Sequence, residues 1–142
     1  MERKGRLDDK VAFITGVAKA DGIGFATATA FAEEGATVAI ADISERVHDC
    51  AASLRERGFT VSSHTADLTK GEQVRRIVEE ALVQHGRIDV LVNNAGMVIC
   101  GQDARFTPFQ ELTEEEWDFE IAINLKTQFL VTRAVVPHMI AC

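Results

Sequence analysis

The 142-residue chain contains no tyrosine, so it has no phenolic side chain that could serve as an acid or a base. Its three cysteines, Cys50, Cys100 and Cys142, are odd in number and widely spaced, which fits neither a disulfide framework nor a paired metal-ligand motif. We interpret them as reduced thiols and expect the protein to be cytoplasmic. No apolar run approaches the roughly 18 residues that are needed to cross a bilayer, so no membrane-spanning segment is expected.

Basic residues are outnumbered as well, with 15 Lys and Arg against 22 Asp and Glu and a formal net charge of -7. An acidic chain without a long basic run is a poor ligand for nucleic acids or anionic membranes, so neither partner is expected. The four histidines, His48, His64, His85 and His138, recur at no metal-ligand spacing, and no metal site is predicted. A hydrophobic content of 46% is typical of a globular protein, and the length allows one domain with a real core.

Short β-branched apolar runs alternate with longer segments that begin at capping residues and end at glycines. Ser44 is expected to cap a helix. Thr69 with Glu72 and Thr113 with Glu116 have the capping-box spacing and predict two further helix starts. The predicted strands are residues 10–15, 37–42 and 60–67, and residues 88–96 are predicted as a fourth strand that runs into a turn. The predicted helices are residues 25–34, 44–57, 69–85 and 114–139.

This alternation of apolar strands and helices predicts an α/β fold, a Rossmann-type doubly wound parallel sheet with helices on both faces. Right-handed crossovers between the parallel strands predict the strand order 3-2-1-4. No strand is predicted after residue 96, so the sheet is expected to be incomplete. Residues 1–142 are expected to form a single domain.

Three glycines, Gly16, Gly22 and Gly24, lie between the first predicted strand and the helix that follows it. Such glycines let the backbone approach a pyrophosphate closely, and the start of the helix offers free N–H groups and a partial positive charge. The five residues between Gly16 and Gly22 are two more than in the common G-x-x-x-G-x-G spacing. The loop predicts a dinucleotide site, and the alternative is that the glycines only shape a turn.

Asp42 ends the second predicted strand, 26 residues after Gly16. A carboxylate at this place can accept hydrogen bonds from a ribose 2′-hydroxyl. It would repel a 2′-phosphate, so NAD is favoured over NADP as the cofactor. Two alternatives stay open, since Lys19 in the glycine loop could meet an added phosphate and Asp42 could simply cap the next helix.

Five segments together resemble the short-chain dehydrogenase/reductase family: TGVAKADGIG (15–24), Asp42, ADL (66–68), NNAG (93–96) and NLKTQF (124–129). They occur in the family's order and spacing and cover nearly the whole chain. The resemblance implies an NAD(P)-dependent oxidoreductase that transfers a hydride between the nicotinamide and a carbinol or carbonyl carbon. The long glycine loop is similar to that of the enoyl-acyl carrier protein reductases, but the NNAG turn favours an ordinary member with an extended loop.

The resemblance also implies roles for individual residues. Asn124 is the implied catalytic residue, an active-site asparagine that helps to hold a water chain for proton transfer. Without the family, Asn93 and Asn94 would be turn residues and Asn124 a polar residue in an apolar helix. The implied cofactor-binding residues are Gly16, Gly22, Ile23, Gly24, Asp42, Asp67, Leu68, Asn93, Ala95 and Gly96.

The family's catalytic serine and Tyr-x-x-x-Lys motif have no counterpart in this chain. We therefore expect residues 1–142 to be an NAD(P)-binding domain that is truncated before these residues and inactive by itself. Completed by the missing half, it would act on a small-molecule alcohol or ketone. The resemblance further implies a homo-oligomer formed through the last helix. The alternative is a noncatalytic nucleotide-binding or oligomerisation module.

Overall fold

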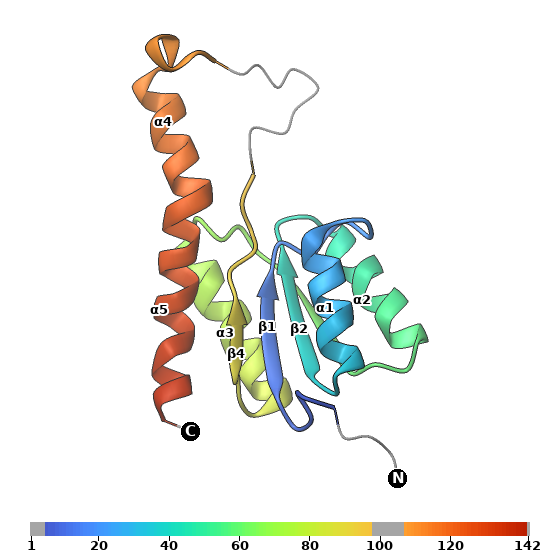
Figure 1. Ribbon diagram of the computed structural model, residues 1–142. Coiled ribbons are helices and arrows are strands. Elements are labelled where there is room, and N and C mark those ends of the chain that lie inside the picture. Colours follow the sequence, from blue (N-terminus) through green and yellow to red (C-terminus); the bar gives the residue numbers. More distant parts are fainter. Residues whose placement is uncertain (1–4, 98–106, 142) are drawn as a thin grey trace.

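The computed structural model describes residues 5–97 and 107–141, which form an α/β structure around one sheet. The strands are β1 (Val11–Thr15), β2 (Thr37–Asp42), β3 (Val61–Thr65) and β4 (Val90–Val92). Neighbouring strands pair in parallel, and their order is β3-β2-β1-β4 (Figure 1). The predicted fold class and strand order are confirmed.

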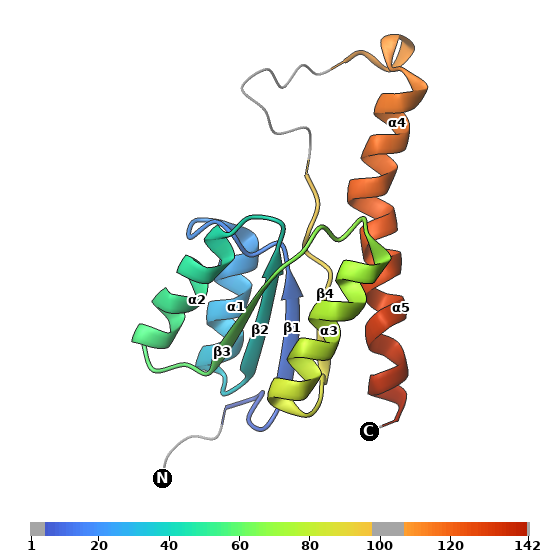
Figure 2. The same cartoon turned by 180° about the vertical axis from the view of Figure 1, so that it is seen from behind.

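Helices cover both faces of the sheet. α1 (Ile23–Glu33) and α2 (Arg46–Glu56) pack on one face, and α3 (Gly71–His85) and α5 (Thr127–Ile140) pack on the other (Figures 1 and 2). A short 3-10 turn, η1 (Phe109–Glu111), precedes α4 (Glu114–Ile121), which extends beyond the sheet. No helix within the described ranges combines the length and the apolar character that crossing a membrane requires.

Side-chain alternation along the two central strands divides the core into two layers. In β1, Ala12 and Ile14 pack with α1 and α2, whereas Phe13 packs with α3 and α5. β2 repeats the pattern, because Val38 and Ile40 join the first layer and the alanines between and after them join the second. Both faces of β1 are therefore covered, which explains its run of buried apolar residues.

Among the predicted reduced thiols, Cys50 lies in the described part of the chain and is free and buried on α2. Burial is the main cause that raises the pKa of its thiol, and the carboxylates of Asp49 and Asp42 raise it further. The thiol is therefore protonated and weakly nucleophilic at neutral pH. Cys100 and Cys142 lie outside the described residues.

β4 covers only residues 90–92 of the segment 88–96, which was predicted as a strand that runs into a turn. It ends at Val92, because the N–H groups of Asn94 and Ala95 donate to the Thr15 hydroxyl, at 3.2 and 3.0 Å, instead of extending the sheet. The NNAG segment is thus a turn that is tied to the end of β1. A polar contact between distant residues sets this boundary, and the apolar pattern of residues 88–92 does not reveal it.

The predicted capping box of Thr69 and Glu72 is wrong. The Thr69 N–H and hydroxyl both donate to Asp67 Oδ1, at 2.9 and 2.6 Å, so this residue closes a turn ahead of α3. The other predicted box is confirmed, because Thr113 Oγ1 accepts the Glu116 N–H at 3.2 Å and Glu116 Oε2 accepts the Thr113 N–H at 2.8 Å.

The last predicted helix, residues 114–139, is interrupted by a π-helical turn, η2 (Ala122–Lys126), between α4 and α5. A wider turn disturbs the regular pairing of main-chain carbonyls. Side chains take up two of them, because the Thr127 hydroxyl donates to Ile123 O at 3.0 Å and Gln128 Nε2 donates to Asn124 O at 2.8 Å. The turn carries Asn124, the residue for which the sequence predicts a catalytic role.

Candidate functional site

A cleft of about 630 Å³ lies at the carboxyl ends of the parallel strands and is lined by Ile123 and Thr127 and by four loop segments. These segments are the glycine loop after β1, the turn between β2 and α2, the loop between β3 and α3, and the NNAG turn after β4. Ligands of open parallel sheets bind at this edge, beside the point where the strand order reverses, here between β1 and β4. The predicted cofactor residues, Asn93 excepted, all line the cleft: Gly16, Gly22, Ile23, Gly24, Asp42, Asp67, Leu68, Ala95 and Gly96.

Two of the three loop glycines are required by close packing. A Cβ on Gly24 would lie 2.3 Å from Gly16 O, and a Cβ on Gly16, whose φ is +77°, would lie 2.8 Å from Ala95 Cα. Gly22 is less constrained, because a Cβ there would lie 3.1 Å from Lys19 O. The Gly22 N–H donates to this oxygen at 3.0 Å, so the extended loop closes in a turn directly before α1.

The start of α1 differs from that of α4 in a way that suits an anion. Gly22 caps α1 without a side-chain hydrogen bond, and the first turn contains no acidic residue. α4 instead has the Thr113 cap and three glutamates in its first turn. Within the described residues, the N-cap of α1 therefore supplies no side-chain acceptor to the first N–H groups of the helix. The positive end of the helix dipole borders the cleft at Ile23 and Gly24.

Asp42 lies where β2 leads into α2, and local hydrogen bonds fix its carboxylate. Oδ1 accepts the Ser44 N–H at 2.9 Å, and the Ser44 hydroxyl accepts the Arg46 N–H at 3.3 Å. α2 begins at Arg46 with Glu45 as its N-cap, so the predicted cap at Ser44 is one residue too early. Ser44 and Arg46 also line the cleft, and Lys19 lines it from the glycine loop. Arg46 was not predicted as a residue of the cleft. Its position soon after Asp42, near the start of a predicted helix, could have indicated it.

The loop between β3 and α3 forms one wall of the cleft, to which Asp67 and Leu68 belong. Its backbone is held where it leaves β3, because the Ala66 N–H donates to Asp42 O at 2.9 Å and the Asp67 N–H donates to Gln73 Oε1 at 2.9 Å. Leu68 is buried against the α3 side of the core. This wall is therefore fixed relative to both β2 and α3.

Thr15 and Asn94 join the ends of β1 and β4. The buried Thr15 hydroxyl donates to Val92 O at 3.5 Å and accepts the two N–H groups of the NNAG turn. Asn94 Nδ2 donates to Thr15 O and to Gly16 O, both at 3.0 Å. Together these two residues hold the glycine loop against the turn.

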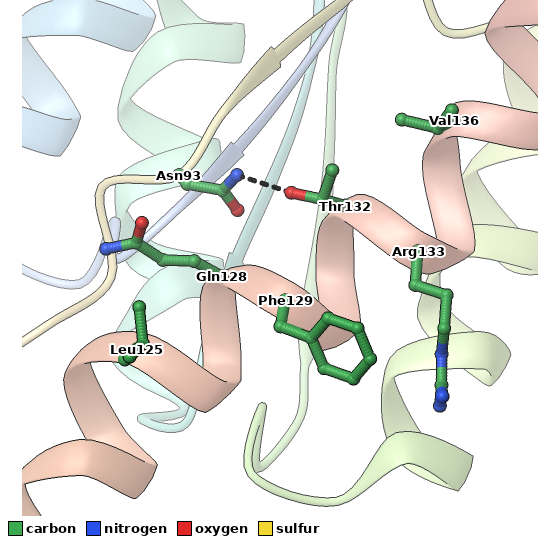
Figure 3. A pocket seen from close by; sticks show the side chains of 7 residues that line it. All are labelled: Asn93, Leu125, Gln128, Phe129, Thr132, Arg133 and Val136. Atoms are coloured by element: carbon green, nitrogen blue, oxygen red, sulfur yellow. Dashed lines mark hydrogen bonds between the residues drawn. The ribbon is translucent and has the colours of Figure 1, made fainter.

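Asn93 lies on the other side of the strand end from Asn94, as neighbouring residues of an extended chain do. Its Nδ2 donates to Thr132 Oγ1 on α5 at 2.9 Å, and it lines a second hollow of about 450 Å³ together with Phe129 (Figure 3). Its buried Oδ1 has no hydrogen-bond partner within the described ranges. The structure thus places Asn93 outside the cleft, with its side chain directed at α5.

Asn124 holds the segment after β4 from the π-helical turn. Its Oδ1 accepts the Met97 N–H at 3.0 Å, and its Nδ2 donates to Met97 O and to Glu120 Oε2, both at 2.9 Å. A Cβ on Gly96 would lie 2.8 Å from Asn124 Oδ1, which explains the glycine there. Asn124 does not itself line the cleft, although its neighbour Ile123 does. Its side chain positions the Gly96–Met97 wall.

A four-stranded parallel sheet, a glycine loop packed against the start of α1, and a carboxylate at the end of β2 share one edge of the molecule. This combination defines the Rossmann class of α/β domains. Comparison with known proteins places the chain more narrowly within that class.

The model of the short chain dehydrogenase family matches residues 10–142, and the chain belongs to this family. The 3-oxoacyl-[acyl-carrier-protein] reductase FabG of Thermotoga maritima is 44% identical over 137 residues, which are 95% of this chain and 52% of that protein. A solved short chain dehydrogenase from Mycobacterium smegmatis is 35% identical, with a TM-score of 0.85 over 97% of this chain and 56% of that one. NAD+-bound xylitol dehydrogenase is 34% identical, with a TM-score of 0.86 over 96% and 50%. The chain spans about half the length of the relatives that it matches.

Proposed function

We propose that the cleft binds a nicotinamide dinucleotide, and that the protein transfers a hydride between it and the carbinol or carbonyl carbon of a small-molecule alcohol or ketone. One observation carries the proposal: the predicted cofactor residues, Asn93 excepted, line a single cleft that borders the start of α1, where the cap Gly22 makes no side-chain hydrogen bond. A cleft of about 630 Å³ is large enough for a small-molecule ligand. Membership of the short chain dehydrogenase family supports the reaction class.

The residues around the cleft fit the parts of such a cofactor. The glycine loop and the first N–H groups of α1 suit the pyrophosphate, because Gly16 and Gly24 bring backbone rather than side chains to this edge. Asp42 suits the adenosine ribose, and Asp67 with Leu68 forms the wall on the adenine side. When bound, the nicotinamide supplies the hydride donor or acceptor. The chain's own residues bind and orient it, and residues 1–142 form one NAD(P)-binding domain.

NAD is the preferred cofactor in this proposal. The Asp42 carboxylate lines the cleft, where it can accept a ribose hydroxyl and would repel a 2′-phosphate. Two cations, Arg46 and Lys19, also line the cleft and favour NADP. Asp42 outweighs them because its Ser44 contact fixes the carboxylate, whereas Lys19 and Arg46 are both exposed.

We expect NADH to bind the chain about tenfold more tightly than NADPH. A like charge about 4 Å from a carboxylate costs about 1 kcal/mol even in water, and the ribose hydrogen bond is lost as well. Asp42→Ala should reduce the difference between the two affinities, because it removes both the repulsion and the hydrogen bond. Fluorescence titrations with each nucleotide measure the two affinities.

Asp21→Ala is the matched control for this experiment. Asp21 is an exposed acid in the same glycine loop, but it does not line the cleft. Its replacement should leave the ratio of the two affinities unchanged. Equal affinities of the parent chain for NADH and NADPH would contradict the proposal that NAD is the preferred cofactor.

Self-association through the α4–α5 face is a second proposed function, favoured by exposed apolar side chains. Trp117, Leu125 and Phe129 are 51%, 60% and 57% exposed. α4 is rich in acids, whereas α5 and the turn before it carry Lys126 and Arg133, so antiparallel contact between two copies pairs unlike charges.

We expect dimers whose fraction rises with protein concentration in sedimentation velocity, and Leu125→Asp should return the chain to monomers. A charge on this face must be desolvated in the contact, whereas it remains hydrated in the monomer. Val83→Asp is the control, because Val83 is exposed on α3, away from this face. A parent chain that stays monomeric at high concentration would rule the interface out.

A further inference from the structure

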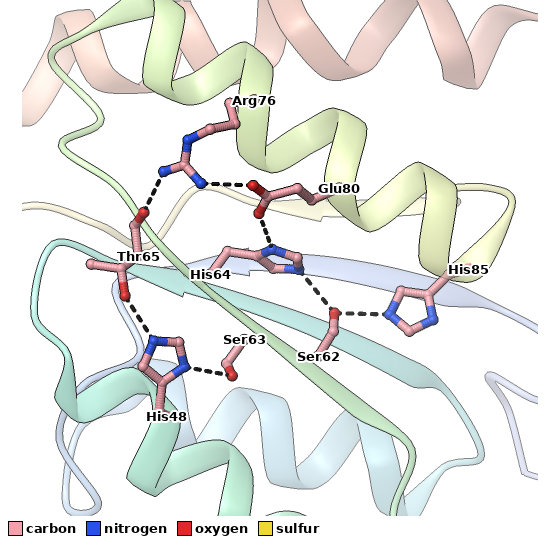
Figure 4. Close-up of polar contacts among 8 residues, drawn as sticks. All are labelled: His48, Ser62, Ser63, His64, Thr65, Arg76, Glu80 and His85. Atoms are coloured by element: carbon pink, nitrogen blue, oxygen red, sulfur yellow. Dashed lines mark hydrogen bonds and ion pairs between the residues drawn. The ribbon is translucent and has the colours of Figure 1, made fainter.

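The edge strand β3 carries two buried polar side chains that the cleft does not use. Ser62 and His64 are 2% and 5% exposed, and both face α3 (Figure 4). His64 Nδ1 lies 3.1 Å from Glu80 Oε2, and His64 Nε2 lies 3.0 Å from Ser62 Oγ. Ser62 Oγ also lies 2.8 Å from His85 Nε2. The four side chains form one continuous chain of hydrogen bonds between β3 and α3.

The donors in this chain can be assigned from the chemistry of its carboxylate end. An ionised carboxylate only accepts, so His64 Nδ1 must carry a hydrogen toward Glu80. In the neutral ring, Nε2 then accepts, and the single Ser62 hydroxyl hydrogen points to it. Ser62 Oγ must therefore accept the hydrogen of His85 Nε2. Every contact has one donor and one acceptor only when His64 is neutral with its hydrogen on Nδ1 and His85 carries a hydrogen on Nε2.

The surroundings keep Glu80 charged and His64 neutral at neutral pH. Burial acts to raise the pKa of Glu80, but hydrogen bonds from His64 and Arg76 outweigh it and hold the pKa below its ordinary value. Burial lowers the pKa of His64, and it outweighs the opposing effect of Glu80. Arg76 on α3 and His48 on α2 lower it further.

His85 and Phe13, the remaining neighbours of His64, do not favour a charge on its ring. Burial, followed by the charge of His64, lowers the pKa of His85, the other titratable group at this end of the chain of hydrogen bonds. From β1, the uncharged ring of Phe13 stacks on His64, with ring centroids 6.2 Å apart.

A proton on His64 Nε2 breaks this arrangement. The ring would then donate to Ser62 Oγ, which already accepts from His85, so the Ser62 hydroxyl hydrogen would be left without an acceptor in a buried site. A hydroxyl in that position is costly unless His85 changes its tautomer. Acidification therefore weakens the link between β3 and α3.

The link lies directly beneath the wall of the cleft. Arg76 Nη1 donates to Glu80 at 2.7 Å, and its Nη2 donates to Thr65 O at 2.8 Å, the last carbonyl of β3. Ala66, Asp67 and Leu68 follow at once and line the cleft. The same carboxylate that orients His64 thus helps to fix the strand end from which this wall departs.

We propose that Glu80, His64, Ser62 and His85 form a pH-sensitive latch between β3 and α3, closed while His64 is neutral and opened by its protonation. Opening the latch loosens the Ala66–Leu68 wall and weakens nucleotide binding. Only this second consequence rests on the proposed function; the latch itself is independent of it.

The direction in which stability changes with pH follows from the shifts in the pKa values of these groups. The folded state lowers the pKa of His64 below its ordinary value of 6.5, so the unfolded chain takes up the proton first as the pH falls, and stability decreases below about pH 6.5. His85 acts in the same direction. The pKa of Glu80 is also lowered, so its contribution is lost only below its ordinary value of 4.5. A comparison of about pH 7.5 with about pH 5 therefore isolates the histidines.

Long-range 1H–15N spectra of the imidazole rings test the latch directly. At about pH 7.5 we expect His64 as the Nδ1–H tautomer and His85 as the Nε2–H tautomer, assigned with His64→Asn and His85→Gln. Neutral His64 with its hydrogen on Nε2 would overturn the proposal, because the ring could not donate to Glu80.

Urea unfolding at about pH 7.5 and pH 5 gives the second readout. The unfolding equilibrium constant of the parent chain should rise about tenfold on acidification, the size expected for one buried hydrogen bond. Ser62→Ala removes the conflict over the hydroxyl hydrogen and should reduce this rise by about half or more. His48→Gln is the matched control, because His48 bonds Ser63 and Thr65 on the opposite side of β3 and is the smallest of the influences on the pKa of His64, so this variant should keep most of the rise. An equal rise in the parent and Ser62→Ala would overturn the latch.

Calorimetric titration with NAD+ at the same two pH values adds the nucleotide readout. Binding should weaken about threefold or more in the parent at the lower pH, and clearly less in Ser62→Ala. Binding that is equal at both pH values would overturn the coupling of the latch to the wall. Absence of binding at either pH would contradict the proposed function, while the tautomers and the unfolding data would still decide on the latch.

Discussion

Replacing Gly24 with alanine is expected to lower the free energy of unfolding by about 1–3 kcal/mol or more, the usual effect of forcing extra atoms into a close-packed site. The new Cβ would lie 2.3 Å from Gly16 O and 2.7 Å from Asn94 Nδ2. Both atoms belong to the contact that holds the glycine loop against the NNAG turn. α1 would have to move away from β1 to relieve the clash.

The same substitution should weaken NADH binding by at least about tenfold. Displacing α1 moves its first N–H groups away from the place of the pyrophosphate, and each hydrogen bond to a charged group contributes about 1.5–3 kcal/mol. Urea denaturation followed by circular dichroism and a fluorescence titration measure the two effects.

Gly71→Ala is the matched control, because Gly71 also opens a helix but a Cβ there would lie 3.5 Å from Leu130 Cδ2, an ordinary contact. This variant should be as stable as the parent or slightly more so, since alanine favours helices. If Gly24→Ala retained full stability and affinity, α1 would not be seated as closely on the loop as the structure has it.

The second large effect is the absence of hydride transfer by the 142-residue chain alone. The chain has no tyrosine to exchange a proton with an alcohol. An amide has no usable acidity near neutral pH, and the Asn124 side chain already bonds Met97 and Glu120. Acid–base catalysis by a positioned group contributes about 10²–10⁴-fold, so its absence should lower turnover by about that factor, and the chain also lacks counterparts of the family's serine and lysine.

Absorbance of NADH during incubation with NAD+ and a panel of simple alcohols measures this turnover. We expect no increase above a sample without protein. Asn124→Ala serves as the control, and it should give the same baseline while it loosens the segment after β4. Steady turnover in the purified parent chain that disappears in Asn124→Ala would show that this asparagine alone supports catalysis, contrary to expectation.

The order of strands and the position of the cleft could be predicted because both depend on local patterns. β2 was predicted at its observed bounds, since a β-branched apolar run between a glycine turn and a helix cap leaves little choice. The right-handed crossover rule then fixed the order. Asp42 and the loop glycines reach the same cleft because carboxyl ends of parallel strands share one edge.

Features that depend on contacts between distant segments could not be predicted. The end of β4 is set by Thr15, some 80 positions earlier in the chain, and the π-helical turn is supported by the side chains of Thr127 and Gln128. The opposite orientations of Asn93 and Asn94 depend on where the strand stops. None of these contacts leaves a periodic trace in the sequence.

The contacts of the histidines could not be predicted from the sequence either. As a sequence pattern, His64 and His85 share no spacing that suggests a common role. They meet at Ser62 only because α3 crosses over β3 and returns its last turn to the start of that strand. The hydrogen-bond partners of the polar residues of β3 therefore depend on how α3 packs on this strand.

A nucleotide titration followed by backbone 1H–15N spectra tests the central claim most directly, because it locates the binding site without requiring turnover. With NADH, we expect saturable shifts at Gly16, Gly24, Asp42 and Leu68 around the cleft, and little change at Phe129 in the second hollow. Shifts that gather around Phe129, or spectra that do not change at saturating NADH, would contradict the account.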